Sequence, residues 1–260
     1  MIEVRNVKKT FGDKIVLEDV STTMLPGKTN LIIGTSGSGK TVLMKCMIGL
    51  YKPDSGQVLY EGKDLTTMED KQLKEVRTQI GMLFQGSALF DSMNVEHNVR
   101  FPLDMFTKMT LGEKNKRVDE VLRRVNLEGV NKKFPAELSG GMKKRVALAR
   151  AIVLNPKYLF CDEPNSGLDP QTSLVIDKLI KEITHEYNIT TVVNTHDMNT
   201  VMESGDNILY MYKGRKQWQG SSKDIIFSDD KLLNDFIFAS EFLYKAKEMS
   251  RMEAEAAMKK

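Results

Sequence analysis

The sequence NLIIGTSGSGKT occupies residues 30–41. An apolar run typical of a buried strand breaks into a glycine-rich turn that ends on lysine and threonine. The turn matches the pattern G-x-x-x-x-G-K-[ST] at every fixed position, and a helix pattern follows it. Glycines at these places let successive backbone N–H groups converge on phosphate oxygens. Because the match lies between a strand and a helix, it predicts a phosphate-binding loop and not a chance turn.

The side chains of this loop have distinct expected roles. Lys40 should reach the β- and γ-phosphates of a nucleotide, and the hydroxyl of Thr41 should ligate Mg²⁺. The helix that begins near Lys40 should add the positive end of its dipole to the cradle. The expected nucleotide-binding residues of the loop are Gly34, Thr35, Ser36, Gly37, Ser38, Gly39, Lys40 and Thr41.

Composition limits the class of protein. The chain has 260 residues, of which 41% are hydrophobic, so a substantial core and one or two domains are expected. The net charge of +3 is small for a chain in which 28% of residues are charged, and we expect no nucleic-acid partner. The sequence has neither a secretory signal pattern nor a long uninterrupted apolar window. With only Cys46 and Cys161 as cysteines, the cytosol is the expected compartment.

Polar residues follow three of the predicted buried strands. Gln85 comes after Ile80–Phe84, the pair Asp162 and Glu163 ends the strand from Tyr158, and His196 follows the strand from Ile189. Ligands of open α/β sheets bind at the carboxyl ends of the strands. Gln85 could instead be a solvated loop amide, and His196 could have only a structural role. Their shared sheet edge makes a common site the better interpretation.

The two acids at this edge have chemistry that suits phosphoryl transfer. Ionised carboxylates are costly to bury unless a cation meets them. Asp162 fits a Mg²⁺ partner, held directly or through water, and Glu163 fits the base or positioner for an attacking water.

A second helix N-terminus follows at residues 138–141, LSGG. Ser139 is a good N-cap, and the exposed N–H groups of Gly140 and Gly141 predict a second anion site. The basic run at residues 143–145 could be a nucleic-acid patch, although a solvated helix face is more usual. Asp169 is predicted to cap the helix that Pro170 opens.

Three segments complete the predicted organisation. Residues 86–150 form a helical subdomain inserted in an α/β domain of residues 1–228, with Phe101-Pro102 interrupting its first helix. Residues 229–260 form a helical extension that should pack on the body or on a second copy, and its last dozen residues should fray. The extension shows an apolar stripe at Leu232, Phe236, Ala239, Leu243 and Ala246.

These motifs occur in the order found in the ATP-binding subunits of ABC transporters, which the chain resembles from Ile2 to about Trp218. The resemblance implies an α/β P-loop NTPase with a RecA-like core, an N-terminal antiparallel β lobe and a helical insertion. It implies an active ATPase that uses ATP and Mg²⁺, with residues 34–41 as Walker A and residues 162–163 as Walker B.

The resemblance also assigns roles to single residues. Phe11 takes the adenine-stacking position, Gln85 the sensor of Mg²⁺ and of the membrane partner, and His196 the switch histidine on the γ-phosphate. The turn from Ser139 to Gly141 would close on the ATP held by a second copy, with Asp169 as the D-loop acid.

Local features resemble one branch of this family more narrowly. The runs MKKR after Gly141, GSALFDSM after Gln85 and FPL at residues 101–103 look like the ATPase of Mla/MCE phospholipid transport. Such a subunit sits on the cytoplasmic face of the inner membrane with a permease and an MCE-type lipid-binding protein. The alternatives are the ATPase of a small-solute importer or exporter, a soluble ABC-type ATPase acting on nucleic acid, and, lowest, a P-loop kinase.

Overall fold

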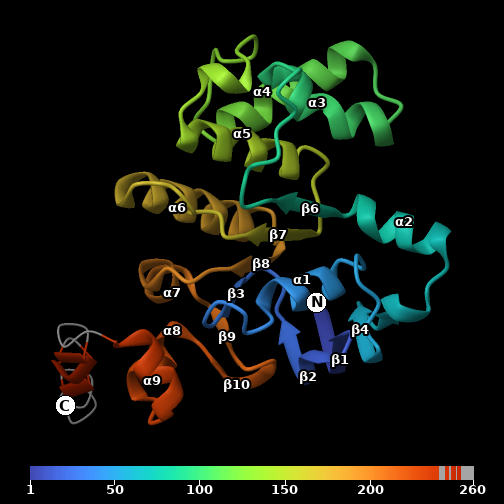
Figure 1. Ribbon diagram of the computed structural model, residues 1–260. Coiled ribbons are helices and arrows are strands. Elements are labelled where there is room, and N and C mark those ends of the chain that lie inside the picture. The colour runs from blue at the N-terminus through green and yellow to red at the C-terminus, as the bar shows by residue number, and fades with distance from the viewer. Residues whose placement is uncertain (240–243, 246, 250, 253–260) are drawn as a thin grey trace.

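The structure is a computed structural model that describes residues 1–239, 244–245, 247–249 and 251–252. Two β-sheets and a cap of helices are stacked along the long axis of the molecule, as Figure 1 shows. The strands and helices alternate in the central part as expected for an α/β fold. Among the described residues, no helix is both long enough and apolar enough to span a bilayer.

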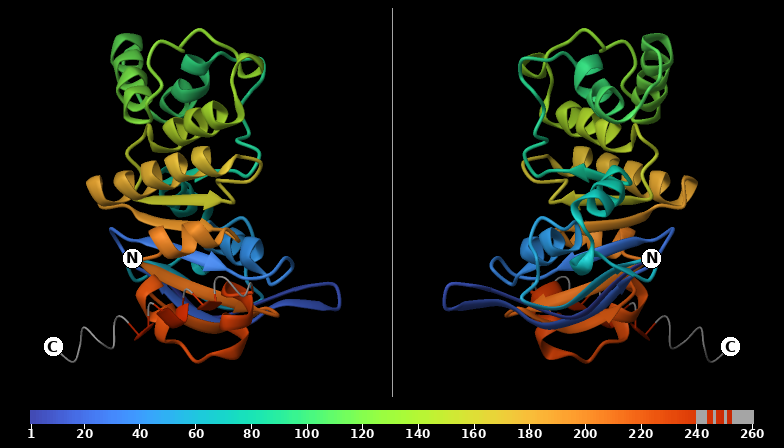
Figure 2. Two further views of the ribbon diagram at one scale, coloured as in Figure 1. Left: turned by 90° about the vertical axis from the view of Figure 1, so that its left-hand side faces the viewer. Right: turned by 90° about the vertical axis from the view of Figure 1, so that its right-hand side faces the viewer.

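The N-terminal sheet is antiparallel, with strand order β2-β1-β4-β5. Its first two strands form a long hairpin, visible in Figure 2 as the segment that extends beyond the body. Buried residues alternate along these strands, which is typical of a sheet with one face on the core. The strands are β1 (Ile2–Phe11), β2 (Lys14–Met24), β4 (Ser55–Tyr60) and β5 (Lys63–Asp64).

The second sheet has the order β10-β9-β3-β8-β7-β6 and is parallel except for β10. Every residue of β3 and β8 is buried, because both faces of this sheet are covered. The strands are β3 (Thr29–Ile33), β6 (Ile80–Leu83), β7 (Tyr158–Asp162), β8 (Thr190–Asn194), β9 (Asn207–Tyr212) and β10 (Arg215–Gly220).

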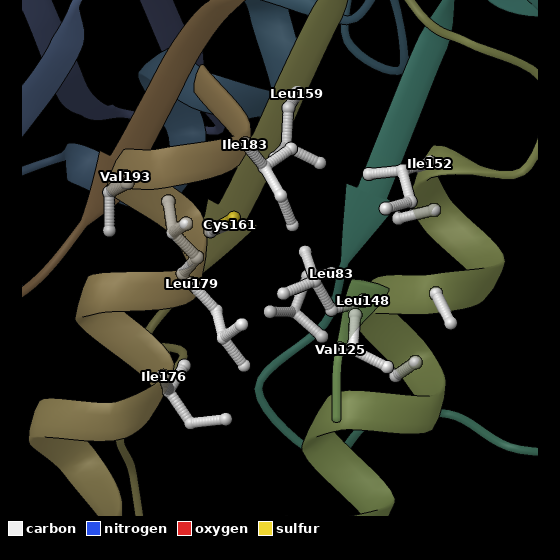
Figure 3. Close-up of a cluster of buried hydrophobic side chains, with 14 of the residues drawn as sticks. Leu83, Val125, Leu148, Ile152, Leu159, Cys161, Ile176, Leu179, Ile183 and Val193 are labelled. Carbon is white, nitrogen blue, oxygen red and sulfur yellow. The ribbon is translucent and has the colours of Figure 1, made fainter. Parts of the chain in front are cut away.

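The two faces of this sheet belong to two hydrophobic cores. Leu31 and Leu159 point to a core shared with α5 and α6, whereas Ile32 and Phe160 point to one shared with α1 and the N-terminal sheet. Figure 3 shows the first of these cores between α5 and α6. The helices around the sheet are α1 (Lys40–Met47), α2 (Asp70–Thr78), α6 (Pro170–Glu186), α7 (Met198–Ser204), α8 (Ser222–Phe227) and α9 (Lys231–Ile237).

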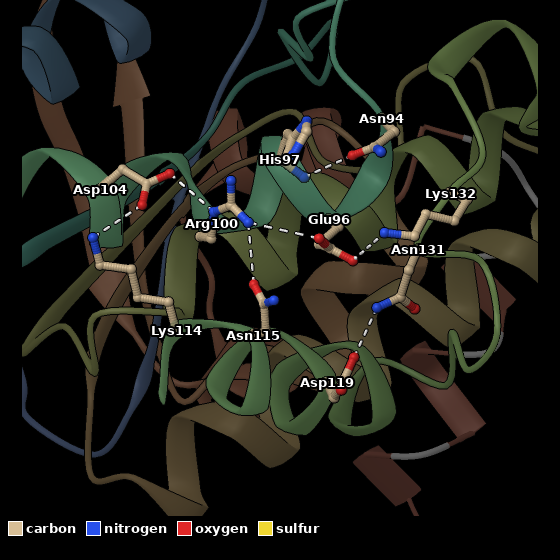
Figure 4. A network of polar contacts seen from close by, with 10 residues as sticks. All are labelled: Asn94, Glu96, His97, Arg100, Asp104, Lys114, Asn115, Asp119, Asn131 and Lys132. Atoms are coloured by element: carbon tan, nitrogen blue, oxygen red, sulfur yellow. Dashed lines mark hydrogen bonds and ion pairs between the residues drawn. The ribbon is translucent and has the colours of Figure 1, made fainter. Parts of the chain in front are cut away.

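The helical insertion consists of α3 (Val95–Phe106), α4 (Leu111–Arg124) and α5 (Gly140–Ile152), which project above the sheet in Figure 2. Short 3₁₀ helices occupy Leu65–Thr67 and Pro135–Glu137. Arg100 joins α3 to α4 through Asn115 at 3.1 Å and contacts Glu96 and Asp104 on its own helix, as Figure 4 shows. This network braces the outer pair of helices.

The structure corrects the expected break at Phe101-Pro102. Helix α3 continues through Pro102 to Phe106. Proline removes one backbone hydrogen bond, but Val99 and Leu103 on either side are 0% and 2% exposed. The burial of this apolar face outweighs the lost bond.

The structure also corrects the single helical stripe expected in the C-terminal extension. Helix α9 ends at Ile237, and Phe238 leaves helical geometry at φ −104°, ψ 40°. Helix α9 packs on the body, since the Phe236 ring stacks on Tyr210 of β9 at 5.2 Å and Leu233 is fully buried. Positions 243 and 246 of the stripe, and residues 253–260 of the segment expected to fray, lie outside the described residues.

Candidate functional site

A cleft of about 1000 Å³ opens over the glycine-rich loop that joins β3 to α1. The loop lines it together with Glu163, which follows β7, and His196, which follows β8. The parallel strands β3, β7 and β8 are neighbours in the sheet, so their carboxyl ends bring these segments to one edge. The residues predicted at this edge are therefore brought together.

The loop has the backbone geometry that its glycines permit. Gly34 has φ +146°, and a Cβ there would lie 2.3 Å from the backbone oxygen of Met211. Gly39, at φ +103°, directly precedes the first residue of α1. The first turn of α1, from Lys40 to Val42, lines the cleft, where the N–H groups of a helix N-terminus suit an anion.

Lys40 lies inside this loop and is 8% exposed. Its ammonium donates to the carbonyl oxygens of Gly34 at 2.8 Å and Thr35 at 3.0 Å. Burial lowers the pKa of Lys40, and the nearby carboxylates of Glu163 and Asp162 oppose that shift. The cation is thus held in the cleft close to both acids.

Glu163, directly after β7, contacts two of the other predicted site residues. Its carboxylate accepts from Gln85 Nε2 at 3.1 Å and lies 3.3 Å from His196 Nδ1. Glu163 has a left-handed backbone at φ +48°, which is uncommon for a residue other than glycine and is often seen at functional sites. Gln85, Glu163 and His196 therefore form one connected cluster, of which Glu163 and His196 line the cleft.

The oxygen donors near the loop suit a magnesium ion. The carboxylate of Asp162 accepts from Asn194 Nδ2 at 2.9 Å, which fixes its orientation. The Thr41 hydroxyl, an Asp162 oxygen and the Gln85 amide oxygen are hard ligands of the kind that Mg²⁺ prefers. These three residues could hold the ion, and they come from α1, β7 and the segment after β6.

Other predicted residues lie away from the cleft lining. Ser139 caps α5 and accepts from Met142 N at 3.3 Å, and Asp169 caps α6 by accepting from Thr172 N at 3.0 Å. A Cβ on Gly141 would lie 2.4 Å from the Thr172 side chain, so the two helix N-termini pack closely. None of the residues from Ser139 to Gly141 lines the cleft over the chain's own loop, and the role of this segment as a second anion site stays a prediction.

Phe11 lies at the end of β1 and is 43% exposed. Its ring meets Tyr51 edge-on at 5.3 Å, and the Lys9 ammonium lies 5.4 Å from its centroid. The ring does not line the cleft, whereas the neighbouring Lys14 and Val16 do. Stacking of Phe11 on adenine stays a prediction.

Sequence reasoning missed several residues that shape the site. Lys144 of α5 is 4% exposed and donates to the backbone oxygen of Gln85. Arg150 of the same helix donates to the carbonyls of Ser87 at 2.9 Å and Ala88 at 2.8 Å. Nothing local in the sequence marks these contacts, because the partners are 59 to 63 positions apart.

Comparison with known proteins agrees with this geometry. The family model described as "ABC transporter" matches residues 17–166, more than half of the chain. In a dimeric structure of a post-hydrolysis state of the ATP-binding cassette MJ0796 bound to ADP and Pi, one chain superimposes with a TM-score of 0.78. That chain is 32% identical, and the match covers 85% of this chain and 99% of the other.

Three curated relatives cover nearly all of the chain. The probable ribonucleotide transport ATP-binding protein mkl of Mycobacterium leprae is 38% identical over 99% of this chain and 75% of its own length. Methionine import ATP-binding protein MetN 1 of Oceanobacillus iheyensis is 42% identical over 91% and 71%. Protein TRIGALACTOSYLDIACYLGLYCEROL 3, chloroplastic, of Arabidopsis thaliana is 38% identical over 92% and 74%. The chain thus spans about three quarters of the length of these relatives.

The fold, the cleft and these matches agree on one class of protein. The expected P-loop NTPase fold with an antiparallel lobe and a helical insertion is confirmed. The chain belongs to the ABC transporter family, as an ATP-binding subunit that hydrolyses ATP.

Proposed function

We propose that this subunit drives phospholipid transport, as a homodimer bound to a permease at the cytoplasmic face of the inner membrane, with an MCE-type lipid-binding protein in the complex. The single observation that carries the coupling is the segment after β6. Gln85 contacts Glu163 in the nucleotide cleft, and Phe84 and Phe90 on either side of it line an apolar groove of about 390 Å³. The segment from Phe84 to Phe90 therefore contacts Glu163 and also lines a groove suited to a partner.

The groove has the character of a docking site for a helix of the permease. It lies between the helical insertion and the edge of the sheet, and its lining includes Phe101 and Phe106 of α3. Phe84, Phe90 and Phe106 are 42%, 41% and 50% exposed. An exposed apolar patch of this kind usually marks an interaction surface.

The choice of a lipid as cargo has separate support. The Arabidopsis relative carries the name of a galactolipid, trigalactosyldiacylglycerol, and is 38% identical over 92% of this chain. The residues after Gly141 and after Gln85 resemble the same branch of the family. The alternative is a small solute, and the methionine importer at 42% identity is the observation in its favour.

Hydrolysis in this proposal rests on positioning and charge neutralisation. The α1 N-terminus and Lys40 bind the phosphates, Glu163 orients the attacking water, and His196 contacts the γ-phosphate. Thr41, Asp162 and Gln85 would hold a Mg²⁺ ion, which would supply positive charge to neutralise the phosphate oxygens. A second copy supplies the N–H groups that follow Ser139, together with Asp169, to complete each site.

The cargo is tested on the membrane complex purified from its native host. We expect phospholipid to co-purify in stoichiometric amounts with the complex, measured by mass spectrometry of extracted lipids. The matched control is the complex that carries Lys40→Ala, which should assemble but should not release lipid when ATP is added. Stimulation of ATP turnover by a soluble amino-acid-binding protein, with no bound lipid, would instead establish the small-solute alternative.

A further inference from the structure

Helix α6 carries a buried carboxylate that the mechanism above does not use. Asp177 is 6% exposed and sits in a closed ring of three hydrogen bonds. Its Oδ1 accepts from Asn165 Nδ2 at 2.9 Å, and its Oδ2 accepts from Thr200 Oγ1 at 2.7 Å. Asn165 Nδ2 also donates to Thr200 Oγ1 at 3.1 Å, which closes the ring.

This placement costs free energy. Burial raises the pKa of Asp177 to about 6, and the carboxylates of Asp197 and Glu203 push it in the same direction. Within the described residues Asp177 has no ion-pair partner. Apolar residues of similar size would fill the same volume without desolvating a charge. Packing alone therefore does not explain an acid at this position.

Two members of the ring, Asn165 and Thr200, lie close in sequence to the residues of the catalytic cluster. Asn165 lies two residues after Glu163, and Thr200 lies on the helix that begins two residues after His196. Glu163 and His196 already meet at 3.3 Å at the cleft. The ring is thus a second bridge between the segments that follow β7 and β8, and it is anchored on a long helix.

The orientation of Asn165 is specified by this ring. Its amide nitrogen serves both partners, and its Oδ1 is buried without a hydrogen-bond partner. Asn165 lines a small cavity of about 130 Å³ together with Asp177 and Asp197. An unpaired buried amide oxygen costs free energy, so the two bonds made by the nitrogen hold the side chain against that cost.

We propose that Asp177 is a positioning residue for ATP hydrolysis, because it holds Asn165 and Thr200 so that the loops bearing Glu163 and His196 meet in one fixed register. The inference rests on the roles proposed above for Glu163 and His196. A small displacement of such groups slows a reaction strongly, on the order of 100-fold for 1 Å. None of the three ring residues lines the cleft over the phosphate loop, so affinity for ATP should not depend on the ring.

The test is a reciprocal exchange in the full chain, assayed by steady-state ATP turnover and by nucleotide binding. Asp177→Asn leaves two amide groups competing for one hydroxyl, and we expect kcat to fall at least about tenfold with KM for ATP changed less than about twofold. The double variant Asn165→Asp with Asp177→Asn restores an acid, an amide and a hydroxyl in the same ring. Its kcat should return to within about threefold of the wild-type value.

Two controls separate positioning from general loss of stability. Thr184→Val removes a buried hydrogen bond of the same helix, to Thr191 Oγ1 at 2.6 Å, and should leave kcat unchanged while it lowers the melting temperature. If Asp177→Asn does not fold, Thr200→Val replaces it as the disrupting variant and Thr200→Ser as its conservative partner. Thr200→Val should lose turnover as Asp177→Asn does, and Thr200→Ser should keep it.

A wild-type kcat in the disrupting variant, Asp177→Asn or Thr200→Val, would overturn the proposal. The proposal is also overturned if neither the double variant nor Thr200→Ser has a higher kcat than that disrupting variant. Glu163→Gln is assayed in parallel to separate this outcome from failure of the catalytic assignment. Turnover that survives Glu163→Gln contradicts the assignment itself. Turnover lost in Glu163→Gln but retained in Asp177→Asn contradicts only the positioning role.

Discussion

The buried carboxylate of Asp177 also makes stability depend on pH. Its pKa of about 6 in the folded chain lies above the ordinary value of 3.8, so the folded chain binds this proton more tightly than the unfolded chain. Between these two pH values the folded state carries more protons. The contribution of Asp177 to the free energy of unfolding therefore falls as pH rises from 3.8 to about 6. Above that pH the contribution is constant.

We predict that Asp177→Asn removes this pH dependence. The free energy of unfolding of the variant minus that of the wild type should rise between pH 4 and pH 6.5, by up to about 3 kcal/mol, and then level off. Urea unfolding of both chains across this range measures it. Asp54→Asn is the contrasting control. Hydrogen bonds from Lys9 and Thr10 lower the pKa of Asp54 to about 2, so the pH dependence that this carboxylate contributes lies below pH 4. A flat difference for Asp177→Asn would show that the carboxylate is not buried in solution.

Among single residues, those with chemistry at a strand end could be placed from the sequence. Asp162, Glu163 and His196 follow buried strands, and parallel topology brings such ends together. The ring around Asp177 could not be foreseen, because an Asp on one helix, an Asn in a turn and a Thr on another helix share no pattern. Their contact depends on the tertiary packing of α6 against α7.

At the scale of elements, helix α5 holds the segment after β6. Lys144 and Arg150 donate to the carbonyls of Gln85, Ser87 and Ala88. Ser87 and Ala88 are consecutive left-handed residues at φ +63° and +48°, a conformation that costs free energy in residues with a Cβ. The two cations of α5 stabilise this strained segment, so the helical insertion and Gln85 should move as one body.

We predict that Lys144→Met uncouples Gln85 from the helix. Turnover of ATP should fall about tenfold, because the Gln85 side chain would no longer be held against Glu163, while nucleotide affinity is retained. The assay is steady-state hydrolysis by the purified chain. Lys181→Met is the matched control, since it removes an ammonium-to-carbonyl bond of the same kind, to Glu203 O at 2.6 Å, far from the cleft. Equal turnover in both variants would contradict the role of Lys144.

The elements themselves were largely predictable where local chemistry sets them. Ser139 and Asp169 cap their helices as expected. The wrong expectations came from reading local sequence signals without the burial that the tertiary structure imposes. Pro102 did not end α3, because its neighbours are buried, and the four-three spacing of the C-terminal stripe did not foresee the end of α9 at Ile237.

At the scale of the whole molecule, the cleft of one chain holds only some of the groups that we propose for the complete site. Its own cleft contains the phosphate loop, Glu163 and His196, whereas the capped N-terminus of α5 does not line that cleft. The similar cassette MJ0796 was solved as a dimer. We therefore expect two copies to sandwich two ATP molecules, each between the loop of one copy and the α5 N-terminus of the other.

The most direct measurement of this claim is made on Glu163→Gln. The substitution keeps the shape of the side chain but removes the carboxylate that would orient water. We predict that ATP binding persists, that hydrolysis falls at least about 100-fold, and that an ATP-dependent dimer accumulates in size-exclusion chromatography with light scattering. Turnover at the wild-type rate, or a chain that stays monomeric with ATP bound, would contradict the account.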